Sequence, residues 1–409
     1  MARKENDFDL LKEELSKELD HLMPEFIRIR QELHKIPEPA REEFKTSALI
    51  KEVLGNAGIE YKSEIGGSTG IAAIINGKNS RPVLAFRADM DALPIEEETE
   101  LPYCSTIRGW MHACGHDFHI SAVLAVGILL NKHRLSMPAS IKLIFQPAEE
   151  DGPTGGAKLM IKEGVLESPR VDAIFAMHVF PSIPLGKIAV LGGPVMASAD
   201  TFKIRITGSG GHAAFPNLAV DPINVAGHLI VAFNTLISKN ISPLDSGVVN
   251  IGIVKGGSKR SVIPNSVYLE GTMRALKNET RILLRTKIAA LCQGICSSMG
   301  ASVDLDWEYS YDPTINDYEM ADLAREGISS LLGQDSIIRE VEPSMTSEDF
   351  AYFLREVPGA MIWAGAGEEN KKMILHSSRL AISDEILSYM IKSYLGLLLK
   401  YLKMRSNIN

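Results

Sequence analysis

The first half of the chain alternates short apolar runs with stretches of helical periodicity. The apolar runs at 70–76, 82–89, 140–147 and 171–179 are typical of buried strands, and helix-like stretches lie before and between them. Strands that alternate with helices predict an α/β domain with a largely parallel sheet. The pattern returns near the C-terminus as a helix at 317–332, a strand at 360–365 and an amphipathic helix from Asp384.

Between residues 198 and 311 the pattern changes to alternating strands and two helices in the order βαββαβ. This order predicts a split-βαβ, ferredoxin-like α+β domain. We therefore expect a larger domain formed by residues 1–197 and 312–409, interrupted by an inserted smaller domain at 198–311. The helix at 279–299 carries Cys292 and Cys296 four residues apart, so we expect both to pack as small apolar groups.

Composition narrows the function classes. The 409 residues are 45% hydrophobic and 23% charged, as is ordinary for a soluble globular protein. The net charge of -8 and the lack of a clustered cationic segment weigh against nucleic-acid binding. There is no apolar run long enough to cross a bilayer, and the charged N-terminal stretch lacks the apolar core of a secretory signal. We expect a cytoplasmic protein with no membrane partner.

Residue types that bind metals gather in four short motifs. MHACGHD contains Cys114 and His116, FQPAEEDG contains Glu149 and Glu150, AMHVFP contains His178, and MILHSS contains His376. Each motif alone is ordinary for a solvated loop or a strand end. Because loops at the carboxyl ends of parallel strands meet at one edge of a sheet, we expect the motifs to lie together.

The combined set exceeds the needs of one zinc ion, which takes four ligands at a structural site and three at a catalytic site. Two cations that share a bridge would use five of these donors, namely Cys114, His116, Glu150, His178 and His376, and could hold a hydroxide as nucleophile. On an extended backbone Glu149 and Glu150 would point to opposite sides, so that one binds an ion while the other faces the substrate. Two alternatives stay open: a thiol hydrolase with Cys114 as nucleophile and His116 as base, and a metal- or peptide-binding protein without catalysis.

Nine motifs in order resemble the M20 family of metallopeptidases, in the branch of aminoacylases, hippurate hydrolases and auxin-conjugate hydrolases. They are RADMDALPI (87–95), MHACGHD (111–117), FQPAEE (145–150), DAIFAMH (172–178), GSGGHAAFP (208–216), DP (221–222), GTMR (271–274), SEDF (347–350) and HSS (376–378).

The resemblance implies a zinc-peptidase-like catalytic domain with an inserted dimerisation lid. It implies that two divalent metal ions, zinc or else manganese, cobalt or nickel, are bound by Cys114, His116, Glu150, His178 and His376. It makes Glu149 the general base and acid, gives Asp89 and Asp91 supporting positions beside the ligands, and makes Arg274 the group that binds a substrate carboxylate. His212 would reach the site of a partner subunit in a homodimer or homotetramer.

The activity implied is hydrolysis of the amide bond of an N-acyl amino acid or a short or blocked peptide, next to a free carboxylate. One departure concerns the substrate loop, where this chain has Ser261 and the family usually has asparagine. A serine lacks the paired donor and acceptor of an amide, so contacts from that loop are expected to differ.

Overall fold

The computed structural model describes residues 2–369 and 371–406, and the chain divides into two compact units. The first unit contains residues 1–193, 315–342 and 352–409, and the second contains 194–314 and 343–351. The return segment 343–351, which carries the SEDF motif, thus groups with the second unit. The division into independent domains at 197/198 and 311/312 stays a prediction.

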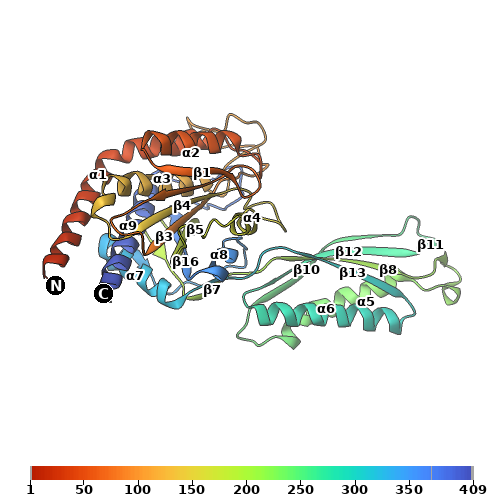
Figure 1. Ribbon diagram of the computed structural model, residues 1–409. Coiled ribbons are helices and arrows are strands. Elements are labelled where there is room, and N and C mark those ends of the chain that lie inside the picture. Colours follow the sequence, from red (N-terminus) through yellow and green to blue (C-terminus); the bar gives the residue numbers. More distant parts are fainter. Residues whose placement is uncertain (1, 370, 407–409) are drawn as a thin grey trace. The chain divides into compact units, whose positions relative to one another are not determined.

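The first unit is built on an eight-stranded mixed sheet with the strand order β1-β2-β4-β3-β5-β16-β6-β15 (Figure 1). The central neighbours β4, β3, β5 and β16 are parallel, and the hairpin of β1 and β2 adds to the sheet in antiparallel fashion. The strands are β1 (Glu60–Ile65), β2 (Gly70–Ile75), β3 (Val83–Asp89), β4 (Ser140–Gln146), β5 (Ala173–Pro184), β6 (Ile188–Ala189), β15 (Ile337–Ile338) and β16 (Gly359–Gly367).

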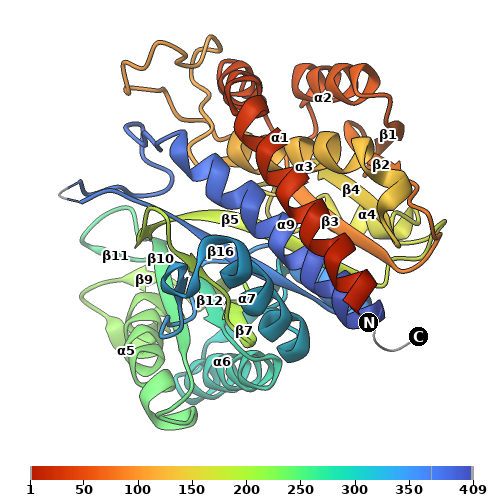
Figure 2. The same cartoon turned by 90° about the vertical axis from the view of Figure 1, so that its left-hand side faces the viewer.

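Every residue of β3 and β4 is buried. Such continuous apolar strands require cover on both faces of the sheet. Part of that cover is visible in Figure 2, where α3 and α9 lie along the sheet and α1 packs against these two helices. The helices of this unit are α1 (Ala2–His34), α2 (Phe44–Asn56), α3 (His116–Lys132), α4 (Ala157–Lys162), α7 (Tyr318–Leu332) and α9 (Glu385–Ser406).

The second unit has a four-stranded antiparallel sheet with the order β10-β12-β8-β13, which confirms the predicted βαββαβ sequence of elements. Alternate residues of β12 are buried, as expected for a sheet covered by helices on one face. Cys292 and Cys296 are buried in the core between sheet and helices, so the predicted apolar role is confirmed. The elements are β8 (Asp200–Thr207), β9 (Gly211–His212), α5 (Pro222–Asn240), β10 (Gly247–Gly256), β11 (Val262–Ile263), β12 (Ser266–Ala275), α6 (Asn278–Ser298) and β13 (Ser302–Tyr309).

Three further elements fall where the chain passes from one unit to the other: β7 (Gly193–Met196), β14 (Thr314–Asn316) and α8 (Ala351–Glu356). Among the described residues, none of the helices combines the length and apolar character that a membrane crossing demands.

Candidate metal centre

The candidate centre lies at the carboxyl edge of the parallel strands in the first unit. Asp89 ends β3 and pairs with Gln146, which ends β4, so the segments that follow these two strands begin side by side. Asp91 lies in the first segment, and Glu149 and Glu150 lie in the second. The fold therefore brings together motifs that are about 60 residues apart in the sequence, as adjacent parallel strands require.

The N-terminus of α3 supplies two more candidate ligands at this edge. Gly115 precedes the helix with a φ of 83°, in the left-handed region that glycine adopts without strain. Cys114 and His116 flank this turn, and both side chains are buried. A side chain at Gly115 would meet Val179 of β5 at 2.4 Å, so the turn also needs glycine to pack against the sheet.

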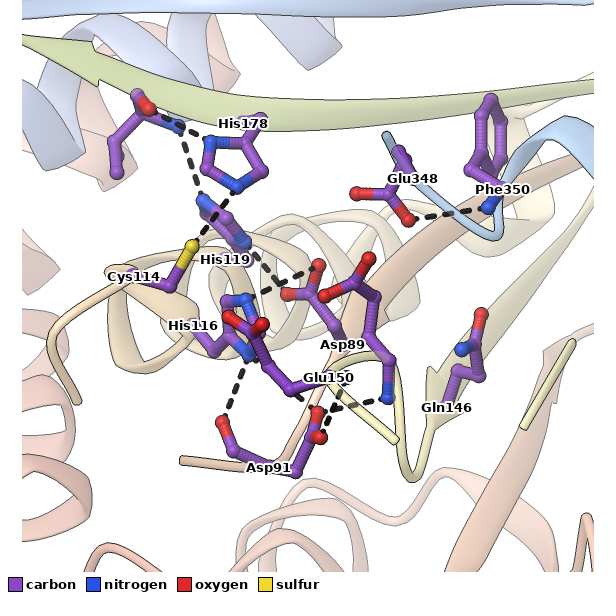
Figure 3. A network of polar contacts seen from close by, with 12 residues as sticks. Asp89, Asp91, Cys114, His116, His119, Gln146, Glu150, His178, Glu348 and Phe350 are labelled. Carbon is purple, nitrogen blue, oxygen red and sulfur yellow. Dashed lines mark hydrogen bonds and ion pairs between the residues drawn. The ribbon is translucent and has the colours of Figure 1, made fainter. Parts of the chain in front are cut away.

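Two histidines are fixed with one ring nitrogen left for an ion (Figure 3). His116 donates from Nδ1 to the carbonyl oxygen of Asp91 at 2.8 Å, and His178 donates from Nδ1 to the carbonyl oxygen of Val179 at 2.7 Å. These bonds turn each Nε2 toward the centre, which is the usual arrangement of metal-bound imidazole. His116 Nε2 has no hydrogen-bond partner in the part of the chain that the structure describes, and the nearest carboxylate oxygen of Asp89 is 3.7 Å away.

The cysteine sulfur belongs to two groups of potential ligands. Cys114 forms one group with His116 and His178 and another with Glu150 and His376, and in each group the ligand atoms lie within 4.8 Å of one another. The Sγ of Cys114 is 3.4 Å from Nε2 of His178, and Nε2 of His376 is 3.3 Å from Oε1 of Glu150. All five predicted ligands therefore lie together, and their donor types fit two cations that share the sulfur.

His376 reaches this centre from the loop after β16. Its backbone N–H donates to the carbonyl oxygen of Ala113 at 2.8 Å, which ties the loop to the residue before Cys114. Its φ of 62° lies in the left-handed region, which is uncommon for a residue with a side chain. The surrounding contacts thus hold a strained backbone to keep this imidazole in place.

The two adjacent glutamates do not follow the geometry expected from an extended strand. The chain bends after Gln146, where Ala148 has a φ of 57°, and Glu149 and Glu150 both lie in the bend. Both carboxylates belong to one group of potential ligands with His116. The expectation that they point to opposite sides was wrong, because a turn and not a strand carries them.

The charges at the centre show what a bound cation would change. Burial raises the pKa of the Cys114 thiol well above its ordinary value, and the carboxylates of Glu150 and Glu149 raise it further. Burial opposes protonation of His116, but the carboxylates of Asp89 and Asp91 outweigh it and raise its pKa to about 10. Both groups therefore hold a proton at neutral pH, and a cation would have to displace it.

Asp89 is held by partners that the sequence analysis did not single out. Its carboxylate accepts a hydrogen bond from Arg87 Nη1 at 2.8 Å and another from His119 Nδ1 at 2.6 Å. His119 Nε2 accepts the backbone N–H of Val179 at 3.0 Å, so the proton of His119 is on Nδ1. The signal for His119 was its position three residues after His116 on one helix, which places both rings on the same face.

A second set of charges lies behind the ligands. The carboxylate of Asp117 accepts hydrogen bonds from two residues of α1, His34 Nδ1 at 2.7 Å and Arg30 Nη1 at 3.4 Å. Burial opposes protonation of His34, but Asp117 and Glu97 raise its pKa to about 9. This network fixes the start of α3, and no local pattern indicates it, because His34 and Arg30 are 83 and 87 positions away from Asp117 along the chain.

Two predicted site residues belong to the second unit. Arg274 is on β12, and its Nη1 donates to the hydroxyl of Ser347 at 3.2 Å. Within the described residues Arg274 pairs with no carboxylate. His212 is exposed on β9, where its Nδ1 accepts the N–H of Ala214 at 3.1 Å, and β9 pairs with β11 next to Ser261.

Comparison with known proteins identifies the family. The model of "Peptidase family M20/M25/M40" matches residues 85–400. The chain belongs to this family. It is 40% identical over 361 residues to an N-acetyl-L-cysteine deacetylase of Bacillus subtilis, covering 88% of this chain and 85% of the relative. It is 36% identical over 380 residues to thermostable carboxypeptidase 1 of Saccharolobus solfataricus, covering 92% and 95%.

Solved structures of the family have the same fold. A Bacillus subtilis protein described as a dinuclear metal-binding peptidase of the M20 family superposes with a TM-score of 0.81 at 32% identity, over 94% of this chain and 99% of that one. The predicted resemblance and fold class are thus confirmed, and this M20 chain is a hydrolase.

Proposed function

We propose that this M20 hydrolase uses two divalent metal ions to cleave the amide bond of N-acyl amino acids or short blocked peptides beside a free carboxylate. The observation that carries the proposal is the Cys114 sulfur, which lies within 4.8 Å of the donor atoms of two separate groups, His116 with His178 and Glu150 with His376. Relatives described as a deacetylase of N-acetyl-L-cysteine and as a carboxypeptidase support the substrate class. N-acetyl-L-cysteine and the C-terminal end of a peptide both contain an acyl carbonyl, an amide nitrogen and a carboxylate, in that order.

The residues would divide between the two ions through the shared sulfur. His116 and His178 would contact one ion, and Glu150 and His376 the other. Thiolate and imidazole donors favour zinc, and manganese, cobalt or nickel can occupy such mixed sites. When bound, the ions would polarise the acyl carbonyl and lower the pKa of water to near neutrality.

Glu149 is the remaining acid at the centre and the candidate for proton transfer. It is buried beside Glu150 and His116. A carboxylate there would take one proton from the attacking water and deliver it to the leaving nitrogen, so that the amine departs neutral. Arg274, a half-buried guanidinium without a carboxylate partner among the described residues, would bind the carboxylate of the substrate in bidentate fashion.

The second unit would act as the lid and the dimerisation surface. β10 is an edge strand of its sheet and bears the exposed apolar side chains Ile253 and Val254, and α5 exposes Ile223 and Val231. An unpaired edge beside exposed apolar residues is typical of a protein interface. We propose a homodimer, or a homotetramer built from two such dimers, in which His212 completes the partner subunit's site and stabilises the oxyanion.

The alternatives are less consistent with the site. A thiol hydrolase needs a lowered cysteine pKa, whereas burial and nearby carboxylates raise that of Cys114. A binder without catalysis has no use for Glu149, which lies at the centre in addition to the five ligands. Both readings remain outcomes of the test.

The test combines chelation with a substrate panel. Activity should disappear on chelation and return with added zinc or manganese, whereas activity that ignores chelators would favour the thiol mechanism. N-acetyl, N-benzoyl and benzyloxycarbonyl amino acids would rank the acyl groups. Each substrate should be compared with its methyl ester, which removes the negative charge: equal turnover of acid and ester would contradict the role of Arg274.

A further inference from the structure

The bend that carries Glu149 and Glu150 is held in a conformation that its own sequence does not favour. Ala148 has a φ of 57°, in the left-handed region, where a residue with a side chain is less stable by about 1–2 kcal/mol. Such a conformation persists only when the surroundings fix it. The contacts that fix this bend therefore decide where the two carboxylates lie.

Three consecutive backbone N–H groups of the bend donate to two buried carboxylates. The N–H groups of Glu149 and Glu150 donate to Oδ1 and Oδ2 of Asp91 at 3.0 and 2.8 Å (Figure 3). The N–H of Ala148 donates to Oε1 of Glu43 at 2.8 Å. Glu43 thus holds the strained residue itself, one position before the proposed base.

Glu43 comes from a distant part of the chain, immediately before α2. Its side chain is fully buried, and it is fixed on both oxygens: Oε1 also accepts the N–H of Arg41 at 2.9 Å, and Oε2 accepts the hydroxyl of Thr69. Burial, with the charge of Asp91 second, raises the pKa of Glu43 to about 7. Keeping a charged carboxylate at this buried position is therefore unfavourable, and the hydrogen bonds from Thr69 and Arg41 offset part of that cost.

The same segment contacts the bend at a second point. Arg41 donates from Nε to Oδ2 of Asp151 at 2.8 Å and from Nη2 to the hydroxyl of Thr154 at 2.9 Å. Residues 41–43 therefore hold the bend at Ala148 and again just beyond Glu150. Residues 41–43 are not among the candidate ligands, and their hydrogen bonds to the bend are the contacts that link them to Glu149 and Glu150.

We propose that Glu43 is a positioning residue, which fixes the carboxylate of Glu149 at its working position through the peptide N–H of Ala148. The inference rests on the proposed role of Glu149 as the base. The proposed role depends on the length of the Glu43 side chain, which brings an acceptor oxygen to the N–H of Ala148, and not on the negative charge.

Two substitutions separate the effect of side-chain length from the effect of charge. Glu43→Gln keeps an oxygen at the same distance and removes the charge, and Glu43→Asp keeps the charge and withdraws the oxygen by one methylene. Glu42→Asp is the matched control, because Glu42 is the exposed neighbour. We expect Glu43→Asp to lower kcat by about 10- to 100-fold, the size of effect that loss of a supporting contact has at a metal site. KM and metal content should stay unchanged, because the N–H of Glu150 keeps its own hydrogen bond to Asp91. Glu43→Gln and Glu42→Asp should lower kcat much less.

A readout independent of turnover accompanies the kinetics. In the metal-free protein, amide hydrogen exchange in a peptide covering the bend should be faster in Glu43→Asp than in the wild type, and unchanged in Glu42→Asp. Equal or greater loss in Glu43→Gln would overturn the proposal in favour of a role of the charge. Loss of bound metal in Glu43→Asp, or no loss of kcat, would overturn it as well.

The parent proposal is tested separately by Glu149→Gln. If Glu149→Gln turns over normally, the role of the base fails whatever Glu43 does. If Glu149→Gln is inactive and Glu43→Asp is not, only the inference on Glu43 fails.

Discussion

At the residue scale, Glu149 is the proposed base and acid, which moves a proton from water to the leaving nitrogen. Glu149→Gln keeps the size of the side chain and removes its ability to accept a proton. We expect kcat to fall by about 10²–10⁴-fold, the usual contribution of general acid–base catalysis. Metal analysis should still find both ions, because the five other donors remain. Turnover within about twofold of the wild type would remove Glu149 from the mechanism.

Metal binding should release protons, because two of the ligands are protonated in the metal-free site. The pKa of His116 is raised to about 10 and that of the Cys114 thiol is raised further above neutrality, whereas burial and then His119 lower the pKa of His178 to about 3. At pH 7 Cys114 and His116 must therefore each lose a proton to bind, and His178 need not.

Metal affinity should accordingly rise with pH throughout the range below about pH 10. The measurement is calorimetric titration of metal-free protein with zinc in two buffers of different ionisation enthalpy. A heat of binding that differs between the buffers confirms proton release, and identical heats would contradict the assignment of these ligands.

At the element scale, the turn before α3 is the part of the fold that the ligands depend on most. Gly115→Ala forces a side chain into the left-handed region and to within 2.4 Å of Val179. We expect a loss of unfolding free energy of about 1–3 kcal/mol and weaker metal binding, because Cys114 and His116 flank the turn.

Gly109→Ala provides the matched control for the backbone. Gly109 also has a positive φ, of 78°, but an added side chain there meets only a carboxylate oxygen of Glu96 at 3.9 Å. Gly109→Ala should lower the free energy of unfolding only by the cost of the positive φ, and the variant should bind metal as the wild type does. If both variants bind metal as the wild type does, the packing of Gly115 against β5 does not position the ligands.

The elements themselves could largely be predicted from the sequence. Helix starts such as Asp221-Pro222 are explicit, and Asp221 does accept the N–H of Ile223 as an N-cap. The strand through His178 was predicted to end at 179 but continues to Pro184, because β16 pairs alongside it. Pairing with a distant strand leaves no local signal.

The parts of the candidate site that consist of donor side chains in motifs could be predicted from the sequence. The parts that depend on the conformation and hydrogen bonds of the backbone could not. The five proposed ligands could be named from the sequence because cysteine, histidine and glutamate are conspicuous in short motifs, and the structure places their donor atoms close together. The bend at Ala148 and its contact with Glu43 were missed, since alanine rarely has a positive φ and the two residues are 105 positions apart. The support for Asp89 by His119 was also missed, although His119 lies three residues after His116 on the same helix, because its partner Asp89 is 30 positions away.

At the scale of the whole molecule, the proposed shared site predicts complementation between inactive subunits. If His212 acts in the partner's site, His212→Ala protein keeps an intact metal centre and Glu149→Gln protein keeps an intact His212. A mixed dimer then contains one complete site. Mixing the two variants should restore measurable activity, up to about a quarter of the wild-type value if subunits exchange freely.

As the control, native mass spectrometry of differently tagged chains measures how many mixed dimers form in the same mixture. Absence of recovery despite mixed dimers would contradict the shared site. Activity of a strictly monomeric form would contradict it as well, independently of the metal centre.

The central claim is that two ions share the Cys114 sulfur, and anomalous diffraction from crystals of active enzyme tests it most directly. Data collected on either side of the absorption edge of the metal should show two peaks per chain, about 3.5–4 Å apart. Both should contact Cys114, with His116 and His178 at one and Glu150 and His376 at the other. Active crystals with one peak, no peak, or metal held instead by Asp89 and His119 would contradict the account.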